Sequence, residues 1–194
     1  TAAERLNVLR KETALEIEKA VTRELTELNF ANALFSVQFT QCPASENGNA
    51  KAEFLISTNK GEAVKPLAKI ASGGELSRIM LALKRIVADY DNIPTMIFDE
   101  IDAGISGKTA GIVGEKLKSI SEKHQVICIT HLPQIAAKGN YHYRIEKYSD
   151  ESATYTNISP IDGADVVEEL ARLLSGTEIT EAARTQAKEL LSQA

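Results

Sequence analysis

The chain has 194 residues, of which 43% are hydrophobic and 25% are charged, so a disordered or collagen-like chain is excluded and one globular domain is expected. No stretch approaches the roughly 18 apolar residues of a membrane span, and the N-terminus lacks a secretory signal pattern, so we expect a cytoplasmic protein without a membrane partner. The net charge of -5 excludes an overall attraction for nucleic acid, so a role on DNA would need local patches or other parts of the protein.

Residues 1–30 contain no glycine or proline and predict a long amphipathic helix. Its periodic positions recur mostly at three- and four-residue steps; they are Leu6, Leu9, Thr13, Ile17, Ala20 and Leu28. Periodicity leaves two alternatives open, the end of a coiled coil or an ordinary surface helix. Residues 35–40 and 52–58 then predict the two strands of a hairpin around the turn-rich residues 45–49.

The middle of the chain predicts an α/β unit. A helix is expected to open at Ser72, and residues 95–98 and 126–130 predict two strands covered on both faces, because neither shows alternation. A helical pattern lies between these strands, so they should be parallel and joined by a right-handed crossover. Further on, residues 143–147 and 154–158 predict a second hairpin around Ser149 and Asp150. Two helices separated by Gly176 end the chain.

The segment from Ser72 to Glu75 begins the clearest helix, and two explanations apply to it. Ser72 and Glu75 are spaced as a capping box, which needs no ligand. Gly73 and Gly74 need another reason, because glycine costs about 1 kcal/mol relative to alanine within a helix. A phosphate approaching the backbone is the natural candidate, since a helix N-terminus offers unpaired N–H groups and the positive end of its dipole.

Two acids, Asp99 and Glu100, follow the apolar strand at residues 95–98. Beside an apolar core both would have to be desolvated or neutralised, and a divalent ion would resolve this for one of them. We expect Asp99 to hold Mg²⁺ and Glu100 to polarise a water for attack on phosphorus. The structural alternative is that Asp99 caps the next turn and Glu100 faces solvent.

His131 follows the second strand and should share one crevice with Asp99 and Glu100. There it would donate a hydrogen bond to a terminal phosphate; the alternative is an ordinary structural histidine. A phosphate-binding P-loop is not found, because the only Gly-Lys-Ser/Thr sequence begins at Gly107 and the glycine required five positions earlier is Asp102. An ATP site on this chain must therefore be completed by another polypeptide segment.

Together these segments resemble the second half of an ABC-type ATPase domain. Residues 72–75 resemble its signature, residues 95–100 its Walker B motif with the catalytic glutamate, residues 101–107 its D-loop, and His131 its switch histidine. More narrowly, residues 67–78, 97–107 and 129–134 resemble the bacterial RecN DNA-repair proteins, which are relatives of the SMC proteins. The resemblance extends over nearly the whole chain.

The resemblance implies an α/β fold, the C-terminal lobe of an ABC/SMC-type head with a parallel sheet flanked by helices. Residues 1–30 would be the end of a coiled coil and residues 31–194 the head lobe. The ligands would be ATP and Mg²⁺; Glu100 and His131 would be catalytic and Asp99 would bind the metal. The residues contacting the nucleotide would be Ser72, Gly73, Gly74, Glu75 and Asp102.

The partners implied by the resemblance are an N-terminal P-loop lobe of the same protein, a second protomer across an ATP sandwich, and DNA. The protein would act in double-strand-break repair at the nucleoid, and this chain alone would not hydrolyse ATP. Two other functions remain open from the sequence, half of the nucleotide-binding domain of a membrane transporter and a non-catalytic dimerisation module.

Overall fold

The computed structural model describes residues 1–70, 72–90, 92–149, 153–176 and 178–193. Ala71 and Asp150, which fall in segments singled out above, lie outside these residues. The longer elements are α1 (Ala2–Glu27), β1 (Leu34–Ser45), β2 (Gly48–Ser57), α2 (Gly73–Val87), β4 (Thr95–Phe98), α3 (Gly107–Ser121), β5 (Gln125–Cys128), β6 (His142–Ser149), β7 (Thr154–Ile161), α5 (Gly163–Ser175) and α6 (Glu181–Ser192). Short ones are β3 (Lys65–Pro66), α4 (Pro133–Ala136) and the 3-10 turns η1 (Leu67–Lys69) and η2 (Ala88–Tyr90).

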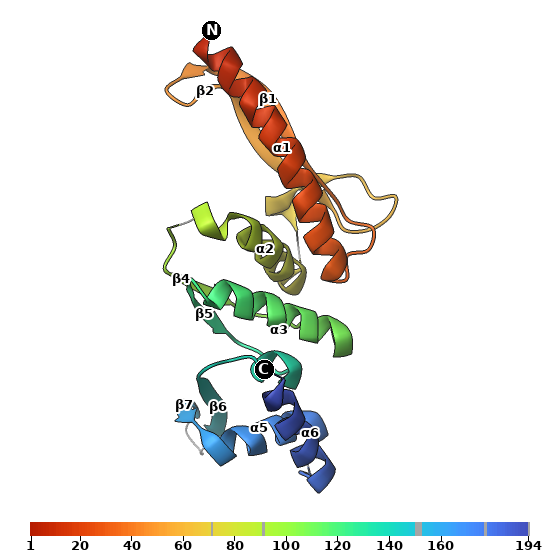
Figure 1. The fold of residues 1–194 in the computed structure, drawn as a ribbon, viewed down its shortest axis with the longest axis vertical. Helices are drawn as coiled ribbons and strands as arrows, with labels where there is room; N and C mark the ends of the chain where they lie inside the picture. The colour runs from red at the N-terminus through yellow and green to blue at the C-terminus, as the bar shows by residue number, and fades with distance from the viewer. Residues whose placement is uncertain (71, 91, 150–152, 177, 194) are drawn as a thin grey trace.

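The molecule is elongated, with α1 and the β1–β2 hairpin at one end and α5 and α6 at the other (Figure 1). The predicted first helix is confirmed, and Thr1 caps it by accepting a hydrogen bond from the Glu4 backbone. In the first half of the predicted apolar face, Leu6 is half-buried but Leu9 is 61% exposed. Only the later turns of α1 reach the main core, and there Val21 and Leu25 are fully buried.

The predicted hairpin is confirmed as the antiparallel pair β1–β2, in register from Leu34 opposite Ser57 to Gln41 opposite Ala50. It lies along α1 (Figure 1). Ser45 pairs with Gly48 at the turn, and Gly48 has φ +92°, a conformation that favours glycine. With β3 the hairpin forms a three-stranded sheet, and the β4–β5 and β6–β7 pairs are two further sheets of the described residues.

The predicted crossover is also confirmed, since β4 and β5 are parallel and α3 connects them. Met96 and Phe98 point into the main core together with apolar residues of α2 and α3. The expectation that both faces would be covered is wrong: Ile97 is 67% exposed and Ile127 is 44% exposed. Strand residues alternate between faces, and among the described residues the helices bury only one face of this pair.

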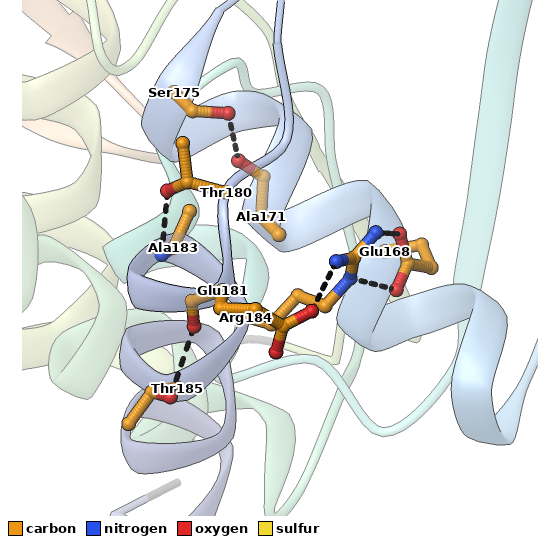
Figure 2. A network of polar contacts seen from close by, with 8 residues as sticks. All are labelled: Glu168, Ala171, Ser175, Thr180, Glu181, Ala183, Arg184 and Thr185. Carbon is orange, nitrogen blue, oxygen red and sulfur yellow. Dashed lines mark hydrogen bonds and ion pairs between the residues drawn. The ribbon is translucent and has the colours of Figure 1, made fainter.

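The other end of the molecule has its own small core, formed by Ala137 with residues of α5 and α6. Gly176 ends α5 with φ +77°, as predicted. Figure 2 shows Arg184 of α6 reaching Glu168 of α5 and Glu181 of its own helix. β6 and β7 confirm the second hairpin. Among the described residues, no helix is both long and apolar enough to cross a membrane.

A buried lysine joins the first helix to the centre of the molecule. Lys116 of α3 is 2% exposed, and its Nζ lies 2.6 Å from Glu24 Oε2 and 2.5 Å from Glu27 Oε2 of α1. Arg85 Nε of α2 lies 3.7 Å from the same Glu24 oxygen. Three helices that surround the core are thus connected through one carboxylate.

Candidate functional site

The predicted start of α2 is confirmed at Gly73. Ser72 has extended backbone and its Oγ accepts a hydrogen bond from the Glu75 backbone N–H at 3.4 Å, as an N-cap residue does. Glu75 lies in the first turn, where a negative charge interacts favourably with the helix dipole. These contacts account for Ser72 and Glu75 as elements of local structure.

The two glycines that follow Ser72 face the loop of residues 99–103, which we call the acid loop. A Cβ atom at Gly74 would lie 2.6 Å from Ala103 Cβ and 2.9 Å from the Glu100 carbonyl oxygen. A Cβ atom at Gly73 would collide with the Glu100 carboxylate. The predicted close approach to these glycines is therefore confirmed, and the chain's own acid loop makes it, so the glycines do not by themselves require a phosphate.

The acid loop holds a strained residue at its centre. Glu100 has φ +54°, in the left-handed region that a non-glycine residue occupies at a cost of about 1–3 kcal/mol. Its backbone N–H donates to Asp99 Oδ1 at 2.9 Å, and its carbonyl accepts from the Ala103 N–H at 3.0 Å. Ser77 Oγ donates to the Asp99 carbonyl at 2.7 Å. The conformation is thus fixed by contacts on both sides of Glu100.

The expectation that Asp99 and Glu100 would be desolvated is wrong, since both are exposed. The buried acid of the loop is Asp102, which is 4% exposed. The difference arises because the loop turns sharply after β4 and directs Ile101 and Asp102 inward, leaving the first two acids at the surface.

Asp102 is the acid that contacts His131. One carboxylate oxygen, Oδ2, accepts from Thr130 Oγ1 at 2.6 Å and from the His131 backbone N–H at 2.8 Å, and lies 2.9 Å from His131 Nδ1. The histidine side chain remains 72% exposed. With Nδ1 directed at Asp102, the other ring nitrogen is the one available to a ligand. Asp102 therefore orients His131, a role that its position in the sequence did not reveal.

The ends of the two parallel strands are held together beside this contact. The Ile129 N–H donates to the Phe98 carbonyl at 3.0 Å, immediately before the acid loop. The predicted meeting of the two polar segments at one sheet edge is thus observed for Asp102 and His131. Ligands of parallel α/β sheets bind at this carboxyl edge.

Sequence reasoning missed Arg78, which is buried at 6% exposure beneath the acid loop. Its Nη1 donates to the carbonyl oxygens of Ile101 at 3.2 Å and Ala103 at 2.6 Å. Its guanidinium carbon lies 5.3 Å from the centre of the Phe30 ring, within cation–π range. The available signal was spacing: Arg78 follows Gly74 by four residues and so shares its helix face.

The environment of Arg78 opposes its charge. Burial lowers the pKa of Arg78, and the nearby carboxylates of Glu75 and Asp102 act in the opposite direction. Its Nε has no hydrogen-bond partner among the described residues. Carbonyl oxygens of the acid loop are therefore its hydrogen-bond acceptors, and no carboxylate bonds directly to it among the described residues.

Asp99 is the residue of this site that fits a magnesium ion. Among the described residues, no group of three or more His, Cys, Asp or Glu side chains is placed to hold a metal. Mg²⁺ commonly binds one or two carboxylates together with substrate phosphates, so a single exposed aspartate suits it better than a complete protein cage would. Cys128 is not a competing ligand, because burial raises its pKa to about 12, with Asp102 and Asp99 acting in the same direction.

Comparisons with known proteins identify relatives along nearly the whole chain, although no family model matches it. DNA repair protein RecN of Xylella fastidiosa (strain 9a5c) is 42% identical over 195 residues, which cover 99% of this chain and 35% of that protein. RecN of Haemophilus influenzae is 44% identical, covering 96% of this chain and 34% of that protein. RecN of Bacillus subtilis is 39% identical, covering 100% and 37%.

Solved structures support the fold. A chain from work on ATP-driven dimerization and DNA-stimulated activation of SMC ATPases matches with a TM-score of 0.50 at 19% identity, covering 89% of this chain and 99% of that one. The Smc head domain of Pyrococcus yayanosii, with a coiled coil and joint, matches with a TM-score of 0.51 at 22% identity, covering 79% and 28%. The chain spans about a third of the length of the curated relatives it matches. The resemblance to the bacterial RecN DNA-repair proteins is therefore confirmed over nearly the whole chain, which has the α/β fold of SMC-type ATPase heads.

Proposed function

We propose that this chain supplies part of a composite ATP-hydrolysing site in a RecN-type, SMC-like protein that acts in DNA double-strand-break repair. The observation that carries the proposal is the position of the acid loop. It packs on the glycines that begin α2 and, through Asp102, contacts His131. The segments resembling signature, Walker B and switch histidine thus meet at one carboxyl edge.

In this proposal Glu100 is the general base, which orients and polarises the attacking water. Its exposed side chain, on a backbone fixed in the left-handed region, is compatible with that role. Asp99 would hold Mg²⁺, whose contribution when bound is to neutralise charge on the phosphate oxygens. His131, oriented by Asp102 through Nδ1, would donate a hydrogen bond to the γ-phosphate through Nε2 in its imidazolium form, in which both ring nitrogens carry a proton.

The start of α2 would serve the nucleotide of a second protomer. Ser72 and Gly73 are exposed, whereas Gly74 is buried beneath the acid loop. A γ-phosphate would therefore approach the helix over Ser72, where the helix dipole favours an anion, because the Glu100 carboxylate already lies against Gly73. Gly74 and Glu75 would support this surface from within, by close packing and by the cap. Asp102 would act through His131.

The P-loop would come from another part of the protein, an N-terminal lobe. The exposed face of the β4–β5 pair supports this proposal, because Ile97, Ile127 and Ile129 leave an apolar strip on a parallel sheet. Parallel sheets are normally covered on both faces. A second lobe lying there would complete both the sheet and the nucleotide site.

The test is to co-express this chain with the P-loop region of its full-length protein and to measure ATP hydrolysis. We expect Mg²⁺-dependent hydrolysis from the complex and none from the chain alone. Hydrolysis by the chain alone, or its absence from a folded and nucleotide-binding complex, would contradict the proposal. Adding linear DNA tests the assignment to DNA repair, because the rate of ATP hydrolysis by the complex should then rise.

The relatives do not favour a membrane-transporter function, because those reported are DNA repair proteins. A non-catalytic dimerisation module makes a different prediction for Ser72→Arg. This change places a bulky cation on the surface proposed for the partner's γ-phosphate and should prevent ATP-dependent association of full-length protomers. Unchanged association, with or without ATP, would favour the non-catalytic function.

A further inference from the structure

We infer that Arg78 is a positioning residue for ATP hydrolysis, which holds the acid loop so that Glu100 keeps its left-handed backbone and its place at the site. The inference rests on the proposed function, since that function gives Glu100 its role. Arg78 itself lies beneath the loop, and we assign it no contact with the nucleotide.

Both hydrogen bonds of Arg78 go to residues that follow the strained Glu100 in the chain. Nη1 donates to the carbonyls of Ile101 and Ala103, the first and third residues after Glu100. On the other side of Glu100, Ser77 holds the Asp99 carbonyl from the same helix. Two neighbouring residues of α2 therefore bind the acid loop before and after Glu100, so the helix determines the path of the backbone between them.

A second set of contacts fixes Arg78 itself. The Phe30 ring, 6% exposed, lies beneath the guanidinium at 5.3 Å from its central carbon. Gly74, one turn earlier on the helix, lets Ala103 approach α2 closely enough for the 2.6 Å hydrogen bond to Arg78. Phe30, Gly74 and Arg78 together therefore stabilise one conformation of the acid loop.

An arginine is an unusual choice if stability alone were required. A buried cation is costly, because its lost hydration is repaid only where the geometry of its new contacts is very good. Nη1 carries two N–H donors in a fixed plane and so can bind two carbonyls of a tight turn at once. Arg78 is therefore suited to hold the backbone of Glu100 in a strained conformation. Strained backbone conformations of this kind are concentrated at functional sites.

The experiment compares variants of the full-length protein in steady-state ATP hydrolysis and in nucleotide binding. Arg78→Met keeps the volume and removes the donors. We expect kcat to fall at least about tenfold, because misplacing a catalytic group by about 1 Å can cost a hundredfold, while the dissociation constant of ATP changes much less. Arg78→Lys should give an intermediate kcat, because lysine keeps a donor and the charge but not the planar geometry.

Two controls separate positioning from general stability. Arg85→Met removes a cation two turns further along the same helix, where Arg85 faces Glu24 of α1 and not the acid loop, and should leave kcat per folded molecule unchanged. Hydrogen exchange of the Ala103 N–H, which bonds to the Glu100 carbonyl, should be faster in Arg78→Met under conditions where the variant remains folded.

The inference is overturned if Arg78→Met retains wild-type kcat, or if kcat falls only in proportion to the folded fraction. It is also overturned if ATP affinity falls as much as kcat does. Should Arg78→Met fail to fold, Arg78→Lys decides by the same measurements. Glu100→Gln is run in parallel: full turnover by that variant removes the proposed function, whereas an inactive Glu100→Gln beside a fully active Arg78→Met removes only the inference.

Discussion

Two buried cations of the molecule have opposite surroundings. Lys116, between α3 and α1, meets the carboxylates of Glu24 and Glu27. Arg78, between α2 and the acid loop, meets backbone carbonyls. The first arrangement neutralises charge and joins helices to each other. The second binds a loop whose conformation is strained.

Burial of a charge does not by itself reveal its purpose. A lysine paired with acids joins regular elements, so its loss should appear mainly as lost stability. An arginine bound to the carbonyls of a turn fixes a backbone path, so its loss should appear mainly as lost turnover.

The largest effect on stability is expected from Lys116→Met. It leaves Glu24, with a side chain 8% exposed, as a buried carboxylate without its main partner, which typically costs about 3–5 kcal/mol. Urea unfolding of the wild type and the variant measures the difference. The double variant Lys116→Met with Glu24→Gln should recover part of the loss. A loss below about 1 kcal/mol, as for an exposed pair, would contradict the account.

Arg78→Met should destabilise the protein less, by about 1.5–3 kcal/mol, the range for hydrogen bonds to a charged group. The comparison is sharpened by measuring kcat in both variants under conditions where each is folded. The ratio of kcat loss to stability loss should be greater for Arg78→Met than for Lys116→Met. The opposite order would show that the two cations do not differ in purpose.

A change remote from both cations provides a reference. Thr180 caps α6 by accepting a hydrogen bond from the Ala183 N–H at 3.1 Å, as Figure 2 shows. Thr180→Ala should cost about 1 kcal/mol and leave kcat unchanged, since α6 lies in the separate small core. A fall in kcat matching that of Arg78→Met would mean that turnover simply follows stability.

The smallest effect concerns pH. The hydrogen bond from Lys116 is the main reason that the pKa of Glu27 lies below its usual value of 4.5. Between that lowered pKa and 4.5 the unfolded chain binds more protons, so the Glu27 contribution is complete above this window and is lost as pH falls through it.

Glu27→Gln should therefore lower the free energy of unfolding at neutral pH, and the difference from wild type should narrow below about pH 4.5. We expect a small difference, because the Glu27 side chain is half exposed. Urea unfolding at several pH values measures it. A difference that stays constant down to pH 3 would exclude this contribution of Glu27.

Much of the fold follows from local patterns in the sequence. The periodicity of residues 1–30 correctly predicted a helix, and the turn before Gly48 correctly predicted a hairpin. The apolar runs at β4 and β5 correctly predicted the strands of a crossover. Local patterns do not show which other element packs against each face of a helix or strand. This is why the exposure of Leu9 and Ile97 was missed: the first lies beyond the main core, and the second faces a side that the described chain leaves open.

The sequence predicted which residues lie at the candidate site better than it predicted the contacts between them. The sequence placed Asp99, Glu100 and His131 at one sheet edge by topology, because both strands end there. It did not predict that Asp102 would hold His131, nor that Arg78 would lie beneath the loop. Both depend on the sharp turn at Glu100, and a left-handed residue other than glycine leaves no mark in a propensity pattern.

The most direct test of the central claim is single-turnover hydrolysis of ATP bound to the full-length protein with Glu100→Gln. The account predicts that ATP binds with nearly unchanged affinity and is cleaved at least about a hundredfold more slowly, the contribution expected of a general base. Cleavage of bound ATP at the wild-type rate would show that the acid loop, however firmly it is held, does not carry out the hydrolysis.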